Sequence, residues 1–310
     1  MELSLRILII GDIHNDLEHL GAVVFMCSNL ELDLIVLTGD FADFLPHTIP
    51  QIKNSRTYRA AENIYYTQLQ AIFKLLATLN VPIVYVHGNH DLRFYDEKFH
   101  KLAYNVDLLS GNEKYIHNNF LAFVGFGGST YTPFRGPYEW KDSIHTFLEI
   151  HQKLANLKPW ILISHCPPKW CQFLDVGYIQ GNHLGSAQVR EIIAEFSPKV
   201  VITGHIHEGS GIDLVDGALV INAGKLAGYD RVELHDSSIY KENIAQVIKW
   251  FILEFDDSFD NLNVQRHGLV FGPRPLALKA NPITLKNGEL VQNGDIIPVT
   301  GNVRYGLDDI

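Results

Sequence analysis

Residues 86–91 read Val86-His87-Gly88-Asn89-His90-Asp91 and end an apolar run, Val81–Val86, that predicts a buried strand. Gly88 allows a tight turn, because it has no Cβ. An amide, an imidazole and a carboxylate follow it. Polar side chains at the carboxyl end of a buried strand lie where α/β sheets bind ligands. In isolation, this turn is better explained as the cap between a strand and a helix.

Four other turns have the same form, and together they change that interpretation. Each follows an apolar run, and a glycine immediately precedes each motif except the one at His165. They follow the predicted strands 5–10, 34–37, 160–164 and 200–203 and supply Asp12 and His14, then Asp40, then His165, then His205 and His207. Five turns that all carry ligand-type residues are hard to explain as caps.

The donors are oxygens and imidazoles without a thiolate, a mixture that suits Mn²⁺, Fe²⁺, Co²⁺ or Zn²⁺. One metal needs about four protein ligands, so eight candidates, with His90 included, suggest two metals. We interpret eight of the other histidines as surface or core residues: His19, His47, His87, His117, His145, His151, His183 and His235.

The order of elements predicts an α/β fold. Strands 5–10, 34–37 and 81–86 alternate with helices at about 16–29 and 58–78, which argues for parallel strands. The second half is richer in strands, at 120–126, 160–164, 200–203, 219–222 and 232–234, with helices at about 143–157 and 186–196.

The character of the chain changes after about residue 238. Residues 240–255 fit a helix face and also an alternating strand, and Asn287-Gly288 is a strong hairpin signal. We therefore predict a main domain over residues 1–238 and a small, β-rich accessory extension over 239–310.

Composition limits the function. The chain has 310 residues, 46% of them hydrophobic, and a formal charge of −10, which is a poor surface for a nucleic-acid backbone. Its three cysteines form no CxxC pattern, and its apolar N-terminus is too short to span a membrane. We expect a soluble, cytoplasmic protein without membrane association; the oligomeric state is not indicated.

These motifs, in this order over about residues 5–235, resemble the calcineurin-like metallophosphoesterase superfamily. The resemblance implies a four-layer αββα sandwich of two mixed sheets flanked by helices, with a dinuclear site at the strand ends. It implies one metal held by Asp12, His14, Asp40 and His207, and a second held by Asp40, Asn89, His165 and His205. It places His90 against the substrate phosphate and leaving group, with Asp43 as the carboxylate that orients this histidine.

Some residues of these motifs differ from those of known branches of the superfamily, and the differences argue against two branches. Ser/Thr protein phosphatases carry Asp-Arg-Gly after the second motif, whereas Phe44 follows Asp43 here, and Asp91 replaces their Glu after Asn-His. Purple acid phosphatases place a tyrosine ligand where Asp43 stands. The pattern is closest to bacterial and archaeal phosphodiesterase-like members.

The implied function is hydrolysis of a phosphodiester or phosphomonoester of a small molecule or nucleotide by a hydroxide that bridges two cations. Mn²⁺ is the expected ion, with Fe, Zn, Co and Ni as alternatives. A metal-dependent nuclease is the alternative function, disfavoured by the acidic balance, and an inactive scaffold of the same fold is a third. Substrate choice depends on four loops, at residues 44–56, 92–111, 130–140 and 166–185.

Overall fold

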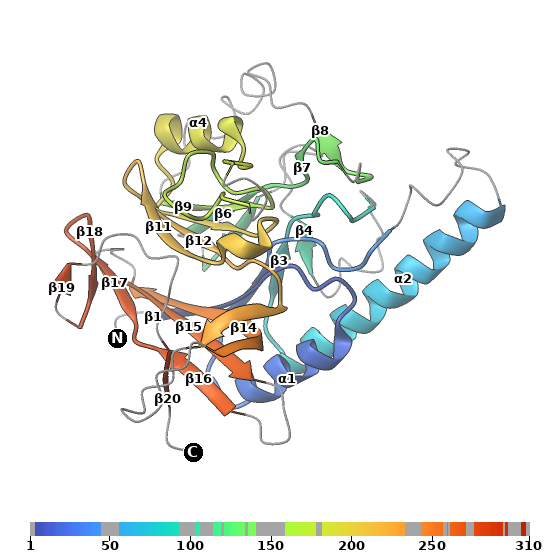
Figure 1. The fold of residues 1–310 in the computed structure, drawn as a ribbon, viewed down its shortest axis with the longest axis horizontal. Helices are drawn as coiled ribbons and strands as arrows, with labels where there is room; N and C mark the ends of the chain where they lie inside the picture. The colour runs from blue at the N-terminus through green and yellow to red at the C-terminus, as the bar shows by residue number, and fades with distance from the viewer. Residues whose placement is uncertain are drawn as a thin grey trace.

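The structure is a computed structural model that describes residues 4–44, 56–92, 103–105, 114–118, 121–133, 136–140, 159–177, 182–232, 243–256, 259, 261–270, 276–293, 295–296 and 305–307. Two mixed β-sheets lie face to face, with α1 and α2 along the outer face of one sheet and α4 over the other (Figure 1). The predicted helix at 143–157 and the loop residues 45–55 lie outside the described residues.

The first sheet has the strand order β19-β18-β17-β15-β14-β1-β2-β3-β4, with β13 paired to β14, β16 to β15, and β20 to β16. Its strands β1 to β4 run parallel to one another, and β14 pairs antiparallel to β1. Their bounds are β1 Ser4–Ile10, β2 Leu34–Leu37, β3 Ile83–Tyr85, β4 Tyr104–Asn105, β13 Ala227–Val232, β14 Asn243–Asp256, β15 Leu262–Val270, β16 Leu276–Ala280, β17 Ile283–Lys286, β18 Glu289–Gln292, β19 Asp295–Ile296 and β20 Tyr305–Leu307.

The second sheet has the order β11-β12-β10-β9-β6-β5, in which β12, β10, β9 and β6 are parallel. Its bounds are β5 Tyr115–His117, β6 Leu121–Phe126, β9 Trp160–Ser164, β10 Val200–Thr203, β11 Gly211–Val215 and β12 Ala218–Asn222. A separate pair joins β7 Ser129–Thr130 to β8 Glu139–Trp140. The described helices are α1 Leu17–Cys27, α2 Arg56–Leu76 and α4 Ala187–Phe196, with short 3-10 turns at Ala77–Leu79 and His207–Gly209.

Three apolar cores account for the four layers. Alternate side chains of a strand point to opposite faces, so Ile7 and Ile9 of β1 enter the core between the sheets, while Leu8 and Ile10 pack toward α1 and α2. A third core fills the space between the second sheet and α4, with Ile192 and Phe196 among its members. The predicted αββα sandwich is confirmed.

Where the structure describes it, the ambiguous stretch at 240–255 is a strand, β14, which begins at Asn243. Its residues Phe251, Leu253 and Phe255 enter the core between the sheets, while Ile248 and Trp250 face the helices. A strand with both faces buried is apolar at most positions, which is why its periodicity also fitted a helix. Because β14 lies between β1 and β15, the chain after residue 238 continues the first sheet. The functional division at residue 238 stays a prediction.

Two smaller differences from the sequence prediction concern the second half. Strand β11 has no counterpart among the predicted strands, and β13 at Ala227–Val232 precedes the predicted 232–234. The hairpin is confirmed: Asn287 and Gly288 adopt φ of 53° and 79° between β17 and β18, as a two-residue turn of this kind requires.

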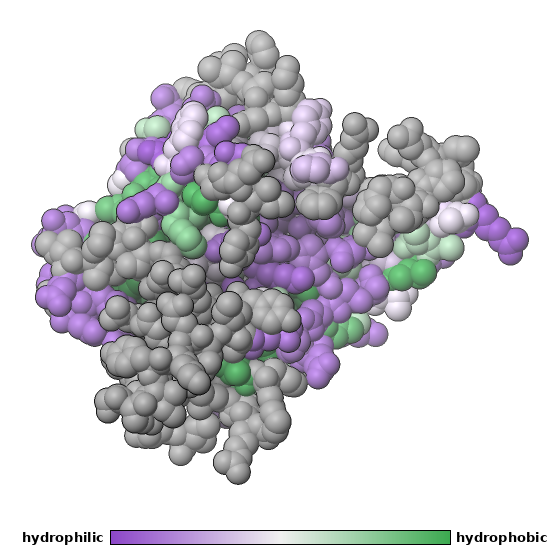
Figure 2. Space-filling model, viewed as in Figure 1, coloured by the Kyte–Doolittle hydropathy of each residue, from purple (hydrophilic) through white to green (hydrophobic). Residues whose placement is uncertain are grey.

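The part of the surface drawn in colour in Figure 2 is largely hydrophilic, with small, separate hydrophobic patches. Among the described residues, no helix is both long enough and apolar enough to cross a membrane.

Candidate metal centre

All five sequence-predicted turns meet at the carboxyl ends of parallel strands. Asp12 follows β1, Asp40 follows β2 and Asn89 follows β3, while His165 and His205 follow β9 and β10 of the facing sheet. Backbone hydrogen bonds join the turns: the amide of His14 donates to the carbonyl of Asp40 at 2.8 Å, and the amide of Gly204 donates to that of His165 at 3.0 Å. The polar turn residues of the two sheets therefore lie close together at one edge of the sandwich.

Glycine is required where two of these turns touch. A Cβ added at Gly39 would lie 2.3 Å from the amide nitrogen of Gly88, and Gly39 has a φ of 106°. A Cβ added at Gly88 would lie 2.0 Å from Asp40 Oδ1. Asp40 itself is held at a φ of 50°, an uncommon conformation for a residue with a side chain. The glycines therefore let the Asp40 and Asn89 turns pack against each other.

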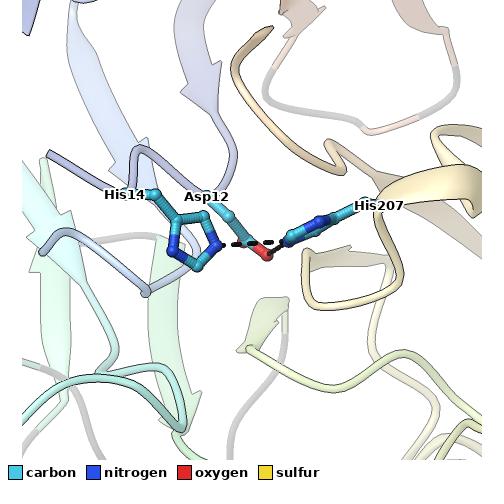
Figure 3. Close-up of side chains that lie close together, drawn as sticks. All are labelled: Asp12, His14 and His207. Carbon is cyan, nitrogen blue, oxygen red and sulfur yellow. Dashed lines mark hydrogen bonds and ion pairs between the residues drawn. The ribbon is translucent and has the colours of Figure 1, made fainter. Parts of the chain in front are cut away.

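A first group of ligand atoms consists of Asp12, His14 and His207, from opposite sheets (Figure 3). His14 Nε2 lies 3.2 Å from His207 Nε2, which lies 3.1 Å from Asp12 Oδ2. His14 Nδ1 lies 2.7 Å from Asp43 Oδ1, and the carboxylate can only accept, so the proton of a neutral His14 ring belongs on Nδ1. His14 Nε2 then offers a lone pair to this group.

A second group consists of Asp12, Asp40 and His165, all nearly or fully buried. His165 Nδ1 lies 2.8 Å from the carbonyl oxygen of Thr38, which can only accept, so the proton of a neutral ring lies on Nδ1. His165 Nε2 is 3.0 Å from Asn89 Oδ1 and 3.4 Å from Asp40 Oδ2. Three acceptor atoms thus face one another without a proton between them when the ring is neutral.

The electrostatics of the site favour a cation. Burial disfavours the charged form of His165, but the carboxylates of Asp40 and Asp12 outweigh it and raise its pKa to about 9. Burial likewise opposes ionisation of Asp40, yet His165 and the neighbouring histidines hold the pKa of Asp40 below its ordinary range. Asp12 and Asp40 are 0% and 2% exposed. Two buried carboxylates demand a cation beside them, because burying unpaired negative charge is costly. Without metal the protonated His165 fills that role, and a divalent metal would fill it with the ring neutral.

Asp43 contacts two histidines, not the single one that the sequence predicts. Its Oδ1 lies 2.7 Å from His14 Nδ1 and 3.2 Å from His90 Nδ1. Hydrogen bonds from His14 and His90 hold the pKa of Asp43 below its ordinary range. Burial lowers the pKa of His90, but the bond to Asp43 and the nearby Asp40 charge raise it overall. Asp43 therefore links a candidate ligand to the candidate substrate-facing histidine.

His205 is the predicted ligand whose ring does not join these groups. Its ring packs on His165 with centroids 4.9 Å apart, and its backbone amide donates to Asp12 Oδ2 at 2.9 Å. Burial, followed by the charge on His165, lowers the pKa of His205 to about 3, so its ring is neutral as a ligand must be.

Asp91 is a site residue for which the sequence analysis assigned no role. Its buried carboxylate accepts from the amide of Phe41 at 3.0 Å, the amide of Gly88 at 2.8 Å and the hydroxyl of Tyr65 at 3.0 Å. Burial and the charge of Asp40 raise the pKa of Asp91 to about 7. Asp91 ties the Asp40 turn to its own turn. Its partners Tyr65 and Phe41 lie 26 and 50 residues away in the sequence. The only sequence signal for Asp91 was therefore its position in the Gly88–Asp91 motif.

His183 is a second residue for which the sequence assigned only a surface or core position. Its Nδ1 lies 2.9 Å from Oδ1 of the fully buried Asp175, and its ring lines a cleft together with His205. No motif surrounds His183 in the sequence, so nothing pointed to this pair.

Comparison with known proteins agrees with this geometry. A family model described as calcineurin-like phosphoesterase matches residues 5–209. An uncharacterised protein of Methanocaldococcus jannaschii, MJ1162, is 33% identical over 159 residues, which make up 49% of this chain and 68% of that protein.

Solved structures give a second comparison. One crystal structure shares the fold, with a TM-score of 0.62 at 20% identity, over 84% of this chain and 98% of the other. TT1561 of Thermus thermophilus gives a TM-score of 0.49 at 18% identity, over 73% and 93% of the two chains. Because the family model covers more than half of the sequence, the chain belongs to the calcineurin-like phosphoesterase family.

Proposed function

We propose that this protein is a metal-dependent phosphoric ester hydrolase that acts on a phosphodiester or phosphomonoester of a small molecule or nucleotide. One divalent cation would be held by Asp12, His14, Asp40 and His207, and a second by Asp40, Asn89, His165 and His205. Mn²⁺ is the ion that we propose, since the donors are oxygen and nitrogen without sulfur.

The observation that carries the proposal is the convergence of acceptors around His165. Asn89 Oδ1 and Asp40 Oδ2 lie 3.0 Å and 3.4 Å from its Nε2, with the ring's own proton directed to Thr38. Family membership supports this class of reaction, in which bound metals would lower the pKa of water and neutralise charge on the phosphate.

The chain's own residues would supply the remaining chemistry. His90 lies at the edge of the site with its ring centroid 5.2 Å from that of His14. Asp43 holds His90 Nδ1–H, which leaves Nε2 to carry a second proton toward the substrate. As an imidazolium, His90 would stabilise negative charge on the phosphate or protonate the leaving oxygen. Asp91 keeps the Asp40 and Asn89 turns in register.

The test is hydrolysis of bis-p-nitrophenyl phosphate by chelator-treated protein before and after addition of Mn²⁺. We expect hydrolysis only with metal, and a rate about 10²–10⁴-fold lower in His90→Ala with metal content unchanged. His117→Ala is a matched control, because this buried histidine lies on β5, outside the site. Metal-bound protein without hydrolysis of any phosphate ester would refute the proposed activity and favour the inactive scaffold. Cleavage of DNA but not of small esters would favour the nuclease.

A further inference from the structure

A cleft of about 280 Å³ opens beside the candidate metal centre. Its lining consists of Thr130–Pro133, here called the first wall, of Lys169 and residues 183–185, here called the second wall, and of His205. Small-molecule pockets start at about 300 Å³, so the cleft has room for one small group and not for a polynucleotide. It shares only His205 with the candidate ligands.

The first wall is anchored on the metal centre. The carboxylate of Glu139 accepts from the amide of Thr132 at 3.2 Å and from that of Gly136 at 2.7 Å, which closes the loop on itself. The amide of Tyr138 donates to the carbonyl of Asn89 at 3.3 Å. This wall is therefore fixed relative to the Asn89 turn, and it presents Tyr131, whose side chain is 70% exposed.

The second wall is built around a buried carboxylate. Asp175 is fully buried and accepts from His183 Nδ1 at 2.9 Å and from the amide of Trp170 at 2.8 Å. The amide of Lys169 donates to the carbonyl of Ser186 at 2.9 Å. Asp175 thereby fixes the His183 ring through Nδ1, and Nε2 would donate to an anion when the ring carries a second proton.

The lining differs in charge from the rest of the chain. Among the described residues that line the cleft are one lysine and two histidines, and no carboxylate. The Lys169 ammonium lies 5.4 Å from the ring centroid of Trp170. Lys169 is thus a cation without a carboxylate beside it among the described lining residues, in a chain of formal charge −10, and such a cleft favours anions.

We propose that this cleft binds a second anionic group of the substrate, carried on the part of the ester that leaves, through Lys169 and His183. The inference rests on the proposed function, because His205 connects the cleft to the place where the scissile phosphate would lie. The substrate class is then a small phosphate ester with a phosphate or carboxylate beyond the scissile bond. Lys169 and His183 would decide specificity without taking part in bond cleavage.

The test is calorimetric binding of three nonhydrolysable ligands to the Mn²⁺-saturated protein: phenylphosphonate, 4-phosphonobenzoate and benzene-1,4-diphosphonate. The last two add a carboxylate or a phosphonate, so they also distinguish the two anions. We expect at least one of them to bind about tenfold or more tightly than phenylphosphonate, as a charge-assisted hydrogen bond provides. Lys169→Met and His183→Gln should each reduce that advantage and leave phenylphosphonate binding unchanged.

Lys199→Met is the matched control, since Lys199 is exposed and precedes β10, at the end of that strand opposite His205. Equal affinity of wild-type protein for all three ligands would overturn the inference, and so would an equal loss in Lys199→Met. The calorimetric affinities do not depend on catalysis. The preference for the doubly anionic ligands therefore tests this inference separately from the proposed hydrolysis of bis-p-nitrophenyl phosphate.

Discussion

Asp43→Asn removes a charge that two histidines share while keeping the size of the side chain. In the structure, Asp43 Oδ1 accepts from His14 Nδ1 at 2.7 Å and from His90 Nδ1 at 3.2 Å. An asparagine oxygen can still accept, but it no longer stabilises positive charge on either ring. The substitution should therefore weaken a candidate metal ligand and change the titration of His90 at the same time.

The size of the metal effect follows from the position of Asp43 behind the ligand. Loss of a carboxylate that orients a ligating histidine costs about 10–100-fold in metal affinity or activity. The side chain of Asp43 is 39% exposed, so water screens part of its charge. We therefore expect the lower end of that range, about tenfold weaker binding of Mn²⁺.

The pH effect has a defined sign. Asp43 helps to raise the pKa of His90, so its neutralisation should lower that pKa. If protonated His90 is the active form, activity is lost as pH rises through its pKa, and the variant should lose activity at lower pH than wild type. The assay is the pH dependence of kcat/KM at saturating Mn²⁺ for an alkyl phosphate ester, whose poor leaving group needs protonation.

Asp16→Asn is the matched control for Asp43→Asn. Asp16 Oδ2 lies 2.6 Å from His19 Nδ1 in a similar carboxylate–imidazole pair, at the start of α1. Asparagine caps a helix about as well as aspartate, so stability should hardly change. An Asp43→Asn profile that coincides with wild type, with Mn²⁺ affinity unchanged, would refute the assigned link between Asp43 and the two histidines.

Three further predictions follow from the geometry. Gly88→Ala should reduce metal binding, because its Cβ would lie 2.0 Å from Asp40 Oδ1 and 2.3 Å from the Asp40 amide nitrogen; metal analysis showing full occupancy would contradict this. The pKa of His165 without metal is about 9, so Mn²⁺ binding at pH 8 should release about one proton from this ring. Calorimetry in buffers of different ionisation enthalpy measures the number of protons released. No release would mean that His165 is not a ligand. A chain truncated after Asp256 should not fold at 25 °C, because it loses five side chains from the core between the sheets, each contributing about 1.5–3 kcal/mol: Phe259, Leu262, Val264, Ile283 and Leu290. A cooperative thermal transition in the truncated chain would contradict this prediction.

The turns that carry the candidate ligands were predictable because their signals are local. An apolar run, a glycine and a polar residue stand next to one another in the sequence, as at Gly39-Asp40 and Gly88-Asn89. Parallel strands that alternate with helices place such turns at one edge of a sheet. Local sequence patterns were therefore enough to identify most of the candidate metal ligands.

Contacts between distant segments were not predictable from one sequence. The roles of Asp91 and Asp175 depend on which backbone amides and side chains the fold brings to them. The apolar pattern of the β14 sequence fits both a helix and a strand, and only its pairing between β1 and β15 shows that it is a strand. The second contact of Asp43, to His14, depends in the same way on how two turns pack.

The most direct test of the central claim is the number of Mn²⁺ ions bound per chain by chelator-treated protein, measured by equilibrium dialysis and elemental analysis. The acceptor atoms around Asp12, Asp40 and His165 support the expectation of two ions per chain in the wild-type protein. Asp40→Asn should lose both, because this carboxylate is assigned to both sites. Two ions still bound to Asp40→Asn, or none bound to correctly folded wild-type protein, would contradict the account.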